Sequence, residues 1–334
     1  MEERSVDSAP VREIGLVGVP SSGKSALFTA LTRSGSHGGQ ANVAVVPVPD
    51  RRLAVLTEME RSRKTVAAQV RFVDVPGGLS SAQGVGKLRE SDALAIVLRC
   101  FGPDPSPAAE LTNVRAELLL ADLAVIGSAS SKAEKRARVK PGPEVDALRR
   151  AREALSAEKP LREARVAEED LLHLKAIAPL TLKPEIVVAN LEEGASVPAE
   201  LGDAVGVYAA IEAETAEMDP EEARALLEEF GVEEPGLEKV IAACYRALDL
   251  VTFLTTGEDE TRAWEVRRGA TAPEAAGAIH TDLQRGFIRA EVISYDELVA
   301  AGSMEKAKAM GKLRVEGKDY VVREGDILHV RFAV

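Results

Sequence analysis

The sequence predicts an α/β fold in which a doubly wound parallel sheet carries a helical insert and is followed by a small C-terminal module. Strand and helix patterns alternate over residues 12–107 and return over 179–248. Between these stretches, residues 108–178 place apolar side chains at helical spacing. Residues 249–334 have the pattern of short strands and turns, which predicts a separate α+β module. Residues 1–11 read as a disordered tail.

Composition limits the possible classes of protein. With 334 residues and 46% hydrophobic content, the chain can build more than one core. A net charge of −12 argues against a DNA-binding or general nucleic-acid-coating protein. Two cysteines cannot build a disulfide framework, and they suit a reducing compartment. The sequence contains no run of 18 apolar residues, so we expect no membrane-spanning helix. We therefore expect a cytoplasmic protein with no membrane partner.

The first strand leads into a phosphate-binding motif. Ile14–Gly18 is a short apolar run, and residues 18–25 read Gly-Val-Pro-Ser-Ser-Gly-Lys-Ser. Glycines at both ends of the loop let the backbone turn so that its N–H groups face phosphate oxygens. Lys24 would reach the terminal phosphates, and Ser25 would place a hydroxyl on Mg²⁺. The motif therefore predicts a site that binds a nucleotide together with Mg²⁺.

A second piece of the site follows about fifty residues later. Phe72-Val-Asp-Val-Pro-Gly77 places an aspartate at the end of an apolar strand. Asp74 would hold Mg²⁺, and the backbone N–H of Gly77 would approach the γ-phosphate. We therefore group Lys24, Asp74 and Gly77 as the candidate catalytic residues.

The third and fourth pieces concern the base of the nucleotide. Asn190-Leu-Glu-Glu193 follows a strand at the place where GTPases carry Asn-Lys-x-Asp. Leu191 replaces the lysine, and the longer Glu193 stands where an aspartate would accept hydrogen bonds from guanine, which favours ATP. Tyr208-Ala-Ala-Ile-Glu212 is a loop of small residues whose backbone, at Ala209, would pass the base. GTP remains an alternative ligand.

The helical insert at 108–178 carries a basic stretch. Residues 131–152 contain eight Lys or Arg against three Asp or Glu in an otherwise acidic protein. This pattern is typical of a solvated helical hairpin, and it also suits a surface that contacts RNA or an acidic partner.

With these four pieces in this order, the chain resembles the Obg-like ATPase (YchF) family. The resemblance extends over most of the chain. It is carried by the sequence motifs Val46-Pro-Val-Pro-Asp50 and the run from Arg262 to Tyr295. It implies a P-loop GTPase-type fold, a coiled-coil-like helical insert and a C-terminal β-grasp domain of the TGS type. It also implies a cytosolic protein that prefers ATP and associates with ribosomes or translation factors, with RNA contacts through the arm or the TGS-like domain.

The resemblance assigns ATP contacts to particular positions. Adenine contacts map to Asn190 and Leu191, and the loop contacts map to Ser21, Ser22, Gly23, Lys24, Ser25 and Ala26.

Three departures from the family pattern bear on hydrolysis. Residues 35–43 contain no threonine at the place of the metal-binding one of the first switch, and residues 78–86 form a shortened second switch. Ile96 replaces a histidine to which the family assigns a catalytic role. Gln83 in the shortened switch is a candidate for orienting water. Two hypotheses follow, a weak or conditional ATPase and a non-catalytic, nucleotide-gated adaptor.

Overall fold

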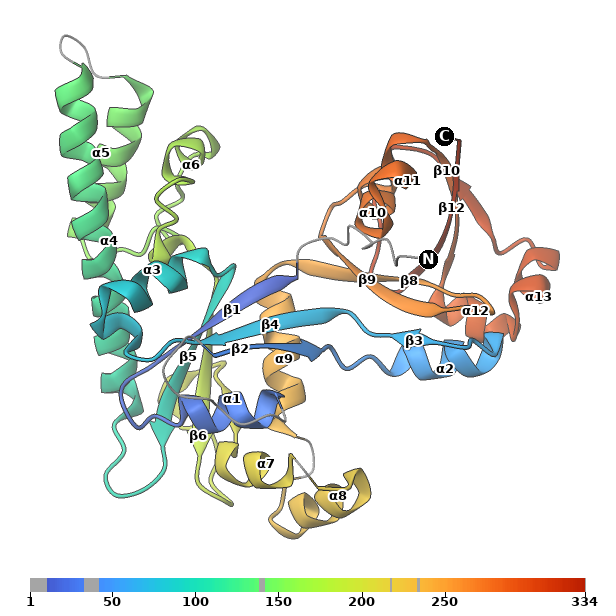
Figure 1. Ribbon diagram of the computed structural model, residues 1–334, viewed down its shortest axis with the longest axis horizontal. Helices are drawn as coiled ribbons and strands as arrows, with labels where there is room; N and C mark the ends of the chain where they lie inside the picture. Colours follow the sequence, from blue (N-terminus) through green and yellow to red (C-terminus); the bar gives the residue numbers. More distant parts are fainter. Residues whose placement is uncertain (1–10, 33–41, 138–141, 217, 233–234, 334) are drawn as a thin grey trace, which may run out of the picture. The chain divides into compact units, whose positions relative to one another are not determined.

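The computed structural model describes residues 11–32, 42–137, 142–216, 218–232 and 235–333. The predicted tail, apart from Val11, and most of the first-switch interval lie outside these residues. The chain divides into two compact units (Figure 1). The P-loop unit comprises Arg12–Val46 and Arg71–Ala247. The C-terminal unit is built around Pro47–Val70 and Leu248–Val334.

A six-stranded sheet forms the centre of the P-loop unit, in the order β2-β4-β1-β5-β6-β7. The strands are β1 (Arg12–Val17), β2 (Asn42–Pro47), β4 (Gln69–Asp74), β5 (Ala93–Cys100), β6 (Glu185–Leu191) and β7 (Val205–Val207). β5 is buried at every position except Arg99, as expected for a strand covered on both faces. β1, β5, β6 and β7 pair in parallel, so their carboxyl ends lie at one edge of the sheet.

Helices surround this sheet and extend from it as an arm. They are α1 (Lys24–Thr32), α3 (Ala82–Glu90), α4 (Pro107–Ala137), α5 (Pro143–Ser156), α6 (Glu168–Leu174), α7 (Ala209–Thr215), α8 (Pro220–Glu229) and α9 (Gly236–Ala247), with 3₁₀ turns at Gly78–Ser80, Leu180–Leu182 and Ala199–Leu201. α4 and α5 lie side by side to form the arm (Figure 1). Apolar residues of α4, α5 and α6, including Ile126, Leu148 and Leu174, bury one another in a core of their own.

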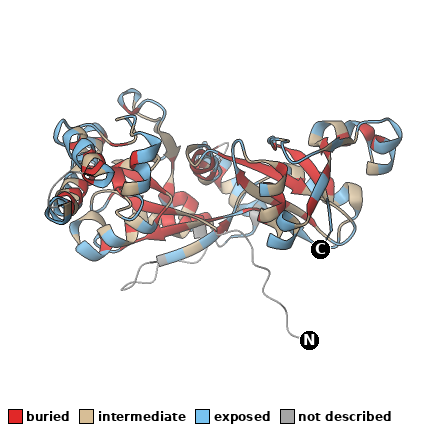
Figure 2. Cartoon of the chain, turned by 90° about the horizontal axis from the view of Figure 1, so that it is seen from above, coloured by how far each residue is buried: buried red, intermediate tan, exposed pale blue. Residues whose placement is uncertain are grey.

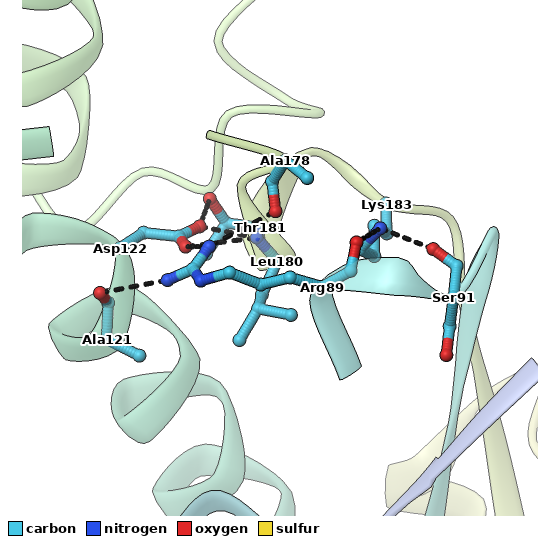
Figure 3. Close-up of polar contacts among 8 residues, drawn as sticks. All are labelled: Arg89, Ser91, Ala121, Asp122, Ala178, Leu180, Thr181 and Lys183. Atoms are coloured by element: carbon cyan, nitrogen blue, oxygen red, sulfur yellow. Dashed lines mark hydrogen bonds and ion pairs between the residues drawn. The ribbon is translucent and has the colours of Figure 1, made fainter. Parts of the chain in front are cut away.

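The base of the arm is fixed by a buried polar cluster around Asp122 of α4 (Figure 3). Its fully buried carboxylate accepts hydrogen bonds from Arg89 of α3 at 2.7 Å, from the backbone N–H groups of Leu180 and Thr181 at 3.0 and 2.8 Å, and from the Thr181 hydroxyl at 2.8 Å. Lys183 donates to the carbonyl oxygens of Arg89 and Ser91. Burial lowers the pKa of Lys183. The cluster joins α3, α4 and the segment that leads into β6.

The C-terminal unit contains a second six-stranded sheet, in the order β11-β10-β12-β8-β9-β3. β8 and β12 pair in parallel at its centre, β9 and β10 pair antiparallel on either side of them, and alanines of α10 pack into its core. Its elements are α2 (Arg51–Glu60), β3 (Thr65–Val66), β8 (Leu250–Thr255), β9 (Thr261–Arg267), α10 (Ala272–Ile279), α11 (Thr281–Arg285), β10 (Phe287–Ser294), α12 (Tyr295–Ala301), α13 (Met304–Ala309), β11 (Arg314–Glu316) and β12 (Asp326–Phe332).

Residues 47–70 differ from the sequence-based domain boundaries. We predicted that they belong to the nucleotide-binding domain, and they pack with the C-terminal unit instead. β3 pairs in parallel with β9, and Arg52 forms an ion pair with Glu324 at 2.7 Å. The Ser62 hydroxyl donates to the carbonyl oxygen of Gly257 at 2.7 Å. These partners lie near the other end of the chain, so no local pattern in 47–70 reveals them.

Burial follows the two sheets (Figure 2). Buried residues gather on the strands, and exposed residues line the outer sides of the helices. Among the described residues, no helix combines the length and the apolar character that a membrane span needs.

Candidate nucleotide-binding site

The loop between β1 and α1 has the backbone geometry that its two glycines permit. Gly23 has φ +92°, and a Cβ atom there would lie 2.0 Å from Nδ2 of Asn190. A Cβ atom on Gly18 would lie 2.4 Å from the carbonyl oxygen of Val97 in β5. Only glycine fits at both positions, because backbone and side-chain atoms already fill the space of a Cβ. The loop therefore wraps tightly around the start of α1, as the motif predicts.

Lys24 lies across this loop. Its Nζ donates hydrogen bonds to the carbonyl oxygens of Gly18 and Val19 at 2.8 and 2.9 Å. Burial lowers the pKa of Lys24, and the nearby carboxylates of Asp74 and Glu110 oppose that shift. The side chain is thus held at the loop by backbone oxygens, which a phosphate oxygen can replace.

Ser25 and Asp74 form the metal-binding side of the site. The Ser25 hydroxyl donates to Oδ2 of Asp74 at 3.3 Å, and Asp74 is only 5% exposed at the end of β4. Burial raises the pKa of Asp74, while Ser25 and Lys24 oppose the rise. A hydroxyl and a carboxylate fit Mg²⁺, which typically takes one or two carboxylates together with phosphate oxygens. No group of three or more His, Cys, Asp or Glu residues that could hold a metal occurs in the described ranges.

A cavity of about 370 Å³ joins these groups. Its lining includes Lys24, Ser25 and Asp74, the segment from Val75 to Ser80, and two residues of α4, Val114 and Glu117. Gly77, at φ +79°, turns the chain at the end of β4 and leads into the 3₁₀ turn 78–80. The three candidate catalytic residues therefore share one cavity.

Asn190 connects the phosphate loop with the loop after β7. Its Nδ2 donates to the carbonyl oxygen of Ser22 at 3.1 Å, and its Oδ1 accepts from the backbone N–H of Ala209 at 3.2 Å. Ala209 is the first residue of α7. The ring of Phe101, in the loop after β5, lies 3.8 Å from the Cβ position of Gly23. The loop after β5, the end of β6 and the connection after β7 thus meet at the phosphate loop.

Two family models match the chain. Residues 13–133 match a model described as 50S ribosome-binding GTPase, and residues 250–333 match YchF-GTPase_C, described as a protein of unknown function (DUF933). A Bacillus subtilis protein named Ribosome-binding ATPase YchF is 38% identical over 361 residues, which cover 96% of this chain and 99% of that protein. A Haemophilus ducreyi protein of the same name is 39% identical over 358 residues, with the same coverage. The chain belongs to the YchF family.

A solved YchF structure has the same fold. The Schizosaccharomyces pombe YchF GTPase matches with a TM-score of 0.83 and 25% identity, over 98% of this chain and 100% of that one. The family and the P-loop GTPase-type fold with its helical insert and C-terminal domain, both predicted from the sequence, are confirmed.

Within this YchF fold, the predicted site residues fall into two groups. Asn190, Ala209 and the loop residues Ser21, Ser22, Gly23, Lys24, Ser25 and Ala26 lie together, although the Ser22 hydroxyl is fully buried without a hydrogen-bond partner among described residues. Leu191 and Glu193 do not join them. The Leu191 side chain packs into the core of the unit, and Glu193 is exposed in the loop after β6.

Further predicted positions have clear outcomes. Ile96 is fully buried in β5, so its side chain belongs to the core of the P-loop unit. Gln83 is exposed on α3 and is absent from the cavity lining, whereas Glu117 of α4 is part of it. Sequence reasoning missed Phe101 and Glu117, because each reaches the site through the tertiary fold from outside the motifs. The only sequence signal for Phe101 was its place directly after an apolar strand.

Proposed function

We propose that this YchF-family protein binds ATP with Mg²⁺ at the phosphate-loop cavity and acts at the ribosome as a weak or conditional ATPase. The observation that carries the proposal is the convergence of Lys24, Ser25 and Asp74 on one cavity at the end of the glycine loop. The relatives named Ribosome-binding ATPase YchF support the ribosome as partner and ATP as nucleotide.

The roles of the residues follow from their positions. Backbone N–H groups of residues 18–25 would bind the phosphates, and the Lys24 ammonium would exchange its carbonyl partners for phosphate oxygens. Ser25 and Asp74 would hold Mg²⁺, which supplies positive charge against the phosphate oxygens when it is bound. Gly77 would bring its backbone N–H to the terminal phosphate.

The base end of the site supports ATP over GTP. Nδ2 of Asn190 has a second N–H that the Ser22 carbonyl does not use, and the Phe101 ring offers an apolar surface beside Gly23. Guanine recognition by the third motif needs a carboxylate that reaches the base, and Glu193 is exposed in a loop without a described contact to this site. GTP binding is the alternative that competition experiments would reveal.

A non-catalytic, nucleotide-gated adaptor is the second candidate function. It is favoured by Ile96, whose apolar side chain is buried where the resemblance places a catalytic histidine. Such a protein would hold ATP intact and use it to order the segment after Asp74.

The arm is the surface that we assign to ribosomal contact. Lys132, Lys135 and Arg136 of α4 are exposed near its outer end, within the basic stretch noted in the sequence. Clustered cations of this kind suit phosphate-rich or acidic partners.

Calorimetry on the full chain tests nucleotide binding. Lys24→Ala should abolish ATP binding, because it removes the only cation among the described residues that line the cavity. Lys64→Ala, in the exposed pair with Glu260, should bind normally. Unchanged ATP affinity in Lys24→Ala would contradict the proposal. Competition between ATP and GTP identifies the preferred nucleotide.

Two further measurements separate the functions. Phosphate release in a single turnover indicates an ATPase, and intact ATP after hours indicates the adaptor. Cosedimentation with ribosomes should depend on ATP in the unaltered protein and lose that dependence in Lys24→Ala. Cosedimentation that is absent under every nucleotide condition would remove the ribosome from the proposal.

A further inference from the structure

The helical arm supplies one wall of the phosphate cavity. Val114 and Glu117 are three positions apart on α4, so their side chains lie on the same face of the helix, and both line the cavity. Val114 and Leu118 are 2% and 1% exposed and pack into the core of the P-loop unit. This packing fixes the first half of α4 against the sheet and holds Glu117 at the cavity.

Of the two carboxylates described in the cavity lining, Asp74 and Glu117, only Glu117 has no hydrogen bond or ion pair with a described residue. Among the described residues, the lining contains four side chains that can accept a hydrogen bond from water, namely Ser25, Asp74, Ser80 and Glu117. Ser25 and Asp74 bind each other and form the metal-binding side. Ser80 is a neutral hydroxyl and a weak base. Glu117 makes no hydrogen bond or ion pair with any described residue and is exposed to solvent, so water reaches it directly.

The residue expected to orient water from the sequence does not occupy this position. Gln83 is the second residue of α3, is exposed, and does not line the cavity. The cavity is therefore lined by the carboxylate of Glu117 from the arm and not by the amide of Gln83 from the shortened switch segment.

We propose that Glu117 is a catalytic residue that orients the water attacking the γ-phosphorus of ATP and accepts its proton. This inference rests on the proposed ATP binding and hydrolysis. The water oxygen forms a bond to the γ-phosphorus, and the bond from that phosphorus to the β,γ-bridging oxygen breaks. ADP leaves with the bridging oxygen, and the proton of the water passes to the Glu117 carboxylate and then to solvent or to the inorganic phosphate.

Glu117→Gln tests the proposal, because the amide keeps the size of the side chain and removes its basicity. Glu134→Gln is the matched control, since it removes the same charge from the same helix outside the cavity lining. ATP affinity is measured by calorimetry with Mg²⁺ present, and hydrolysis is measured as phosphate release with protein in excess over ATP. Positioned bases typically contribute about 10²–10⁴-fold to rate. We therefore expect at least a 100-fold slower single turnover in Glu117→Gln.

Affinity separates a catalytic role from a structural one. Glu117→Gln should keep ATP affinity within about fivefold of the unaltered protein, because loss of an exposed charge changes binding by about 1 kcal/mol or less. Glu134→Gln should match the unaltered protein in both measurements.

The failures of the two proposals are distinguishable. If the unaltered protein does not bind ATP, the proposed function fails and Glu117 has no substrate. If ATP binds and Glu117→Gln hydrolyses it at the unaltered rate, only the inference about Glu117 is overturned. The inference is also overturned if the unaltered protein leaves bound ATP intact, or if Glu117→Gln loses ATP binding together with hydrolysis.

Discussion

Asp122→Asn should strongly destabilise the P-loop unit, because the carboxylate serves four donors at the base of the arm (Figure 3). An asparagine has a single acceptor oxygen. Its NH₂ group would face donors that now bind Oδ1 or Oδ2. The Thr181 hydroxyl can rotate and accept, but a backbone N–H of Leu180 or Thr181 cannot.

The structure sets the size of the effect. Asp122 is fully buried and the Arg89 side chain is 13% exposed, so the pair is largely removed from water. Removal of one partner of a buried pair costs about 3–5 kcal/mol, and an orphaned buried N–H costs about 1–3 kcal/mol. Arg89 keeps its bonds to the carbonyl oxygens of Ala178 and Ala121, which limits the loss. We expect a decrease of about 3–5 kcal/mol in the free energy of unfolding.

Urea unfolding, followed by far-ultraviolet circular dichroism without nucleotide, measures this change. Asp146→Asn is the matched control, because Asp146 pairs with Arg149 on the exposed side of α5 and such a pair contributes about 1 kcal/mol or less. Hydrogen exchange gives a second measure, since the amides of Leu180 and Thr181 should lose protection in Asp122→Asn. A decrease below about 1 kcal/mol with both amides still protected would refute the reasoning.

Two other expectations can be checked directly. Gly23→Ala should weaken ATP binding and destabilise the P-loop unit by about 1–3 kcal/mol, because it combines φ +92° with a Cβ contact to Asn190. Calorimetry and urea unfolding measure both effects, and Gly127→Ala, in open space on α4, should be harmless. Cys100 and Cys244 should resist alkylation in the native protein at pH 8, since burial raises their pKa values to about 11 and about 12. The unfolded thiols ionise near 9.0 and the folded thiols only at these higher values, so the free energy of unfolding should fall as pH rises from about 9 towards the folded values. Rapid labelling of either thiol at pH 8 would contradict the burial and the raised pKa values of these cysteines.

The phosphate loop could be predicted from the sequence because its chemistry is local. Eight consecutive residues specify the turn, the lysine and the hydroxyl, and a preceding apolar strand places them at the sheet edge. Asp74 could also be predicted from the sequence, because it lies at the end of an apolar strand. The phosphate loop and Asp74 could both be predicted because only residues adjacent to them in the sequence determine them.

Other features depend on which parts of the chain meet in three dimensions. Glu117 reaches the cavity because α4 packs on the sheet through Val114 and Leu118, and nothing in its own neighbourhood indicates phosphate chemistry. The orientation of Leu191 did have a signal. Successive residues of a strand face opposite sides, so an Asn190 that faces the phosphate loop directs Leu191 into the core.

The pairing of residues 47–70 with the C-terminal unit has a consequence for synthesis of the protein. The Ser62 and Thr261 hydroxyls, 2.7 Å apart, lie 199 positions apart along the chain. At translation rates of about 5–20 residues per second, α2 and β3 leave the ribosome roughly 10–40 s before the strand that receives them. During that interval their apolar residues, Leu53 and Leu56 among them, have no final partner. The nascent chain therefore exposes this early segment until β9, with which β3 pairs, has been synthesised.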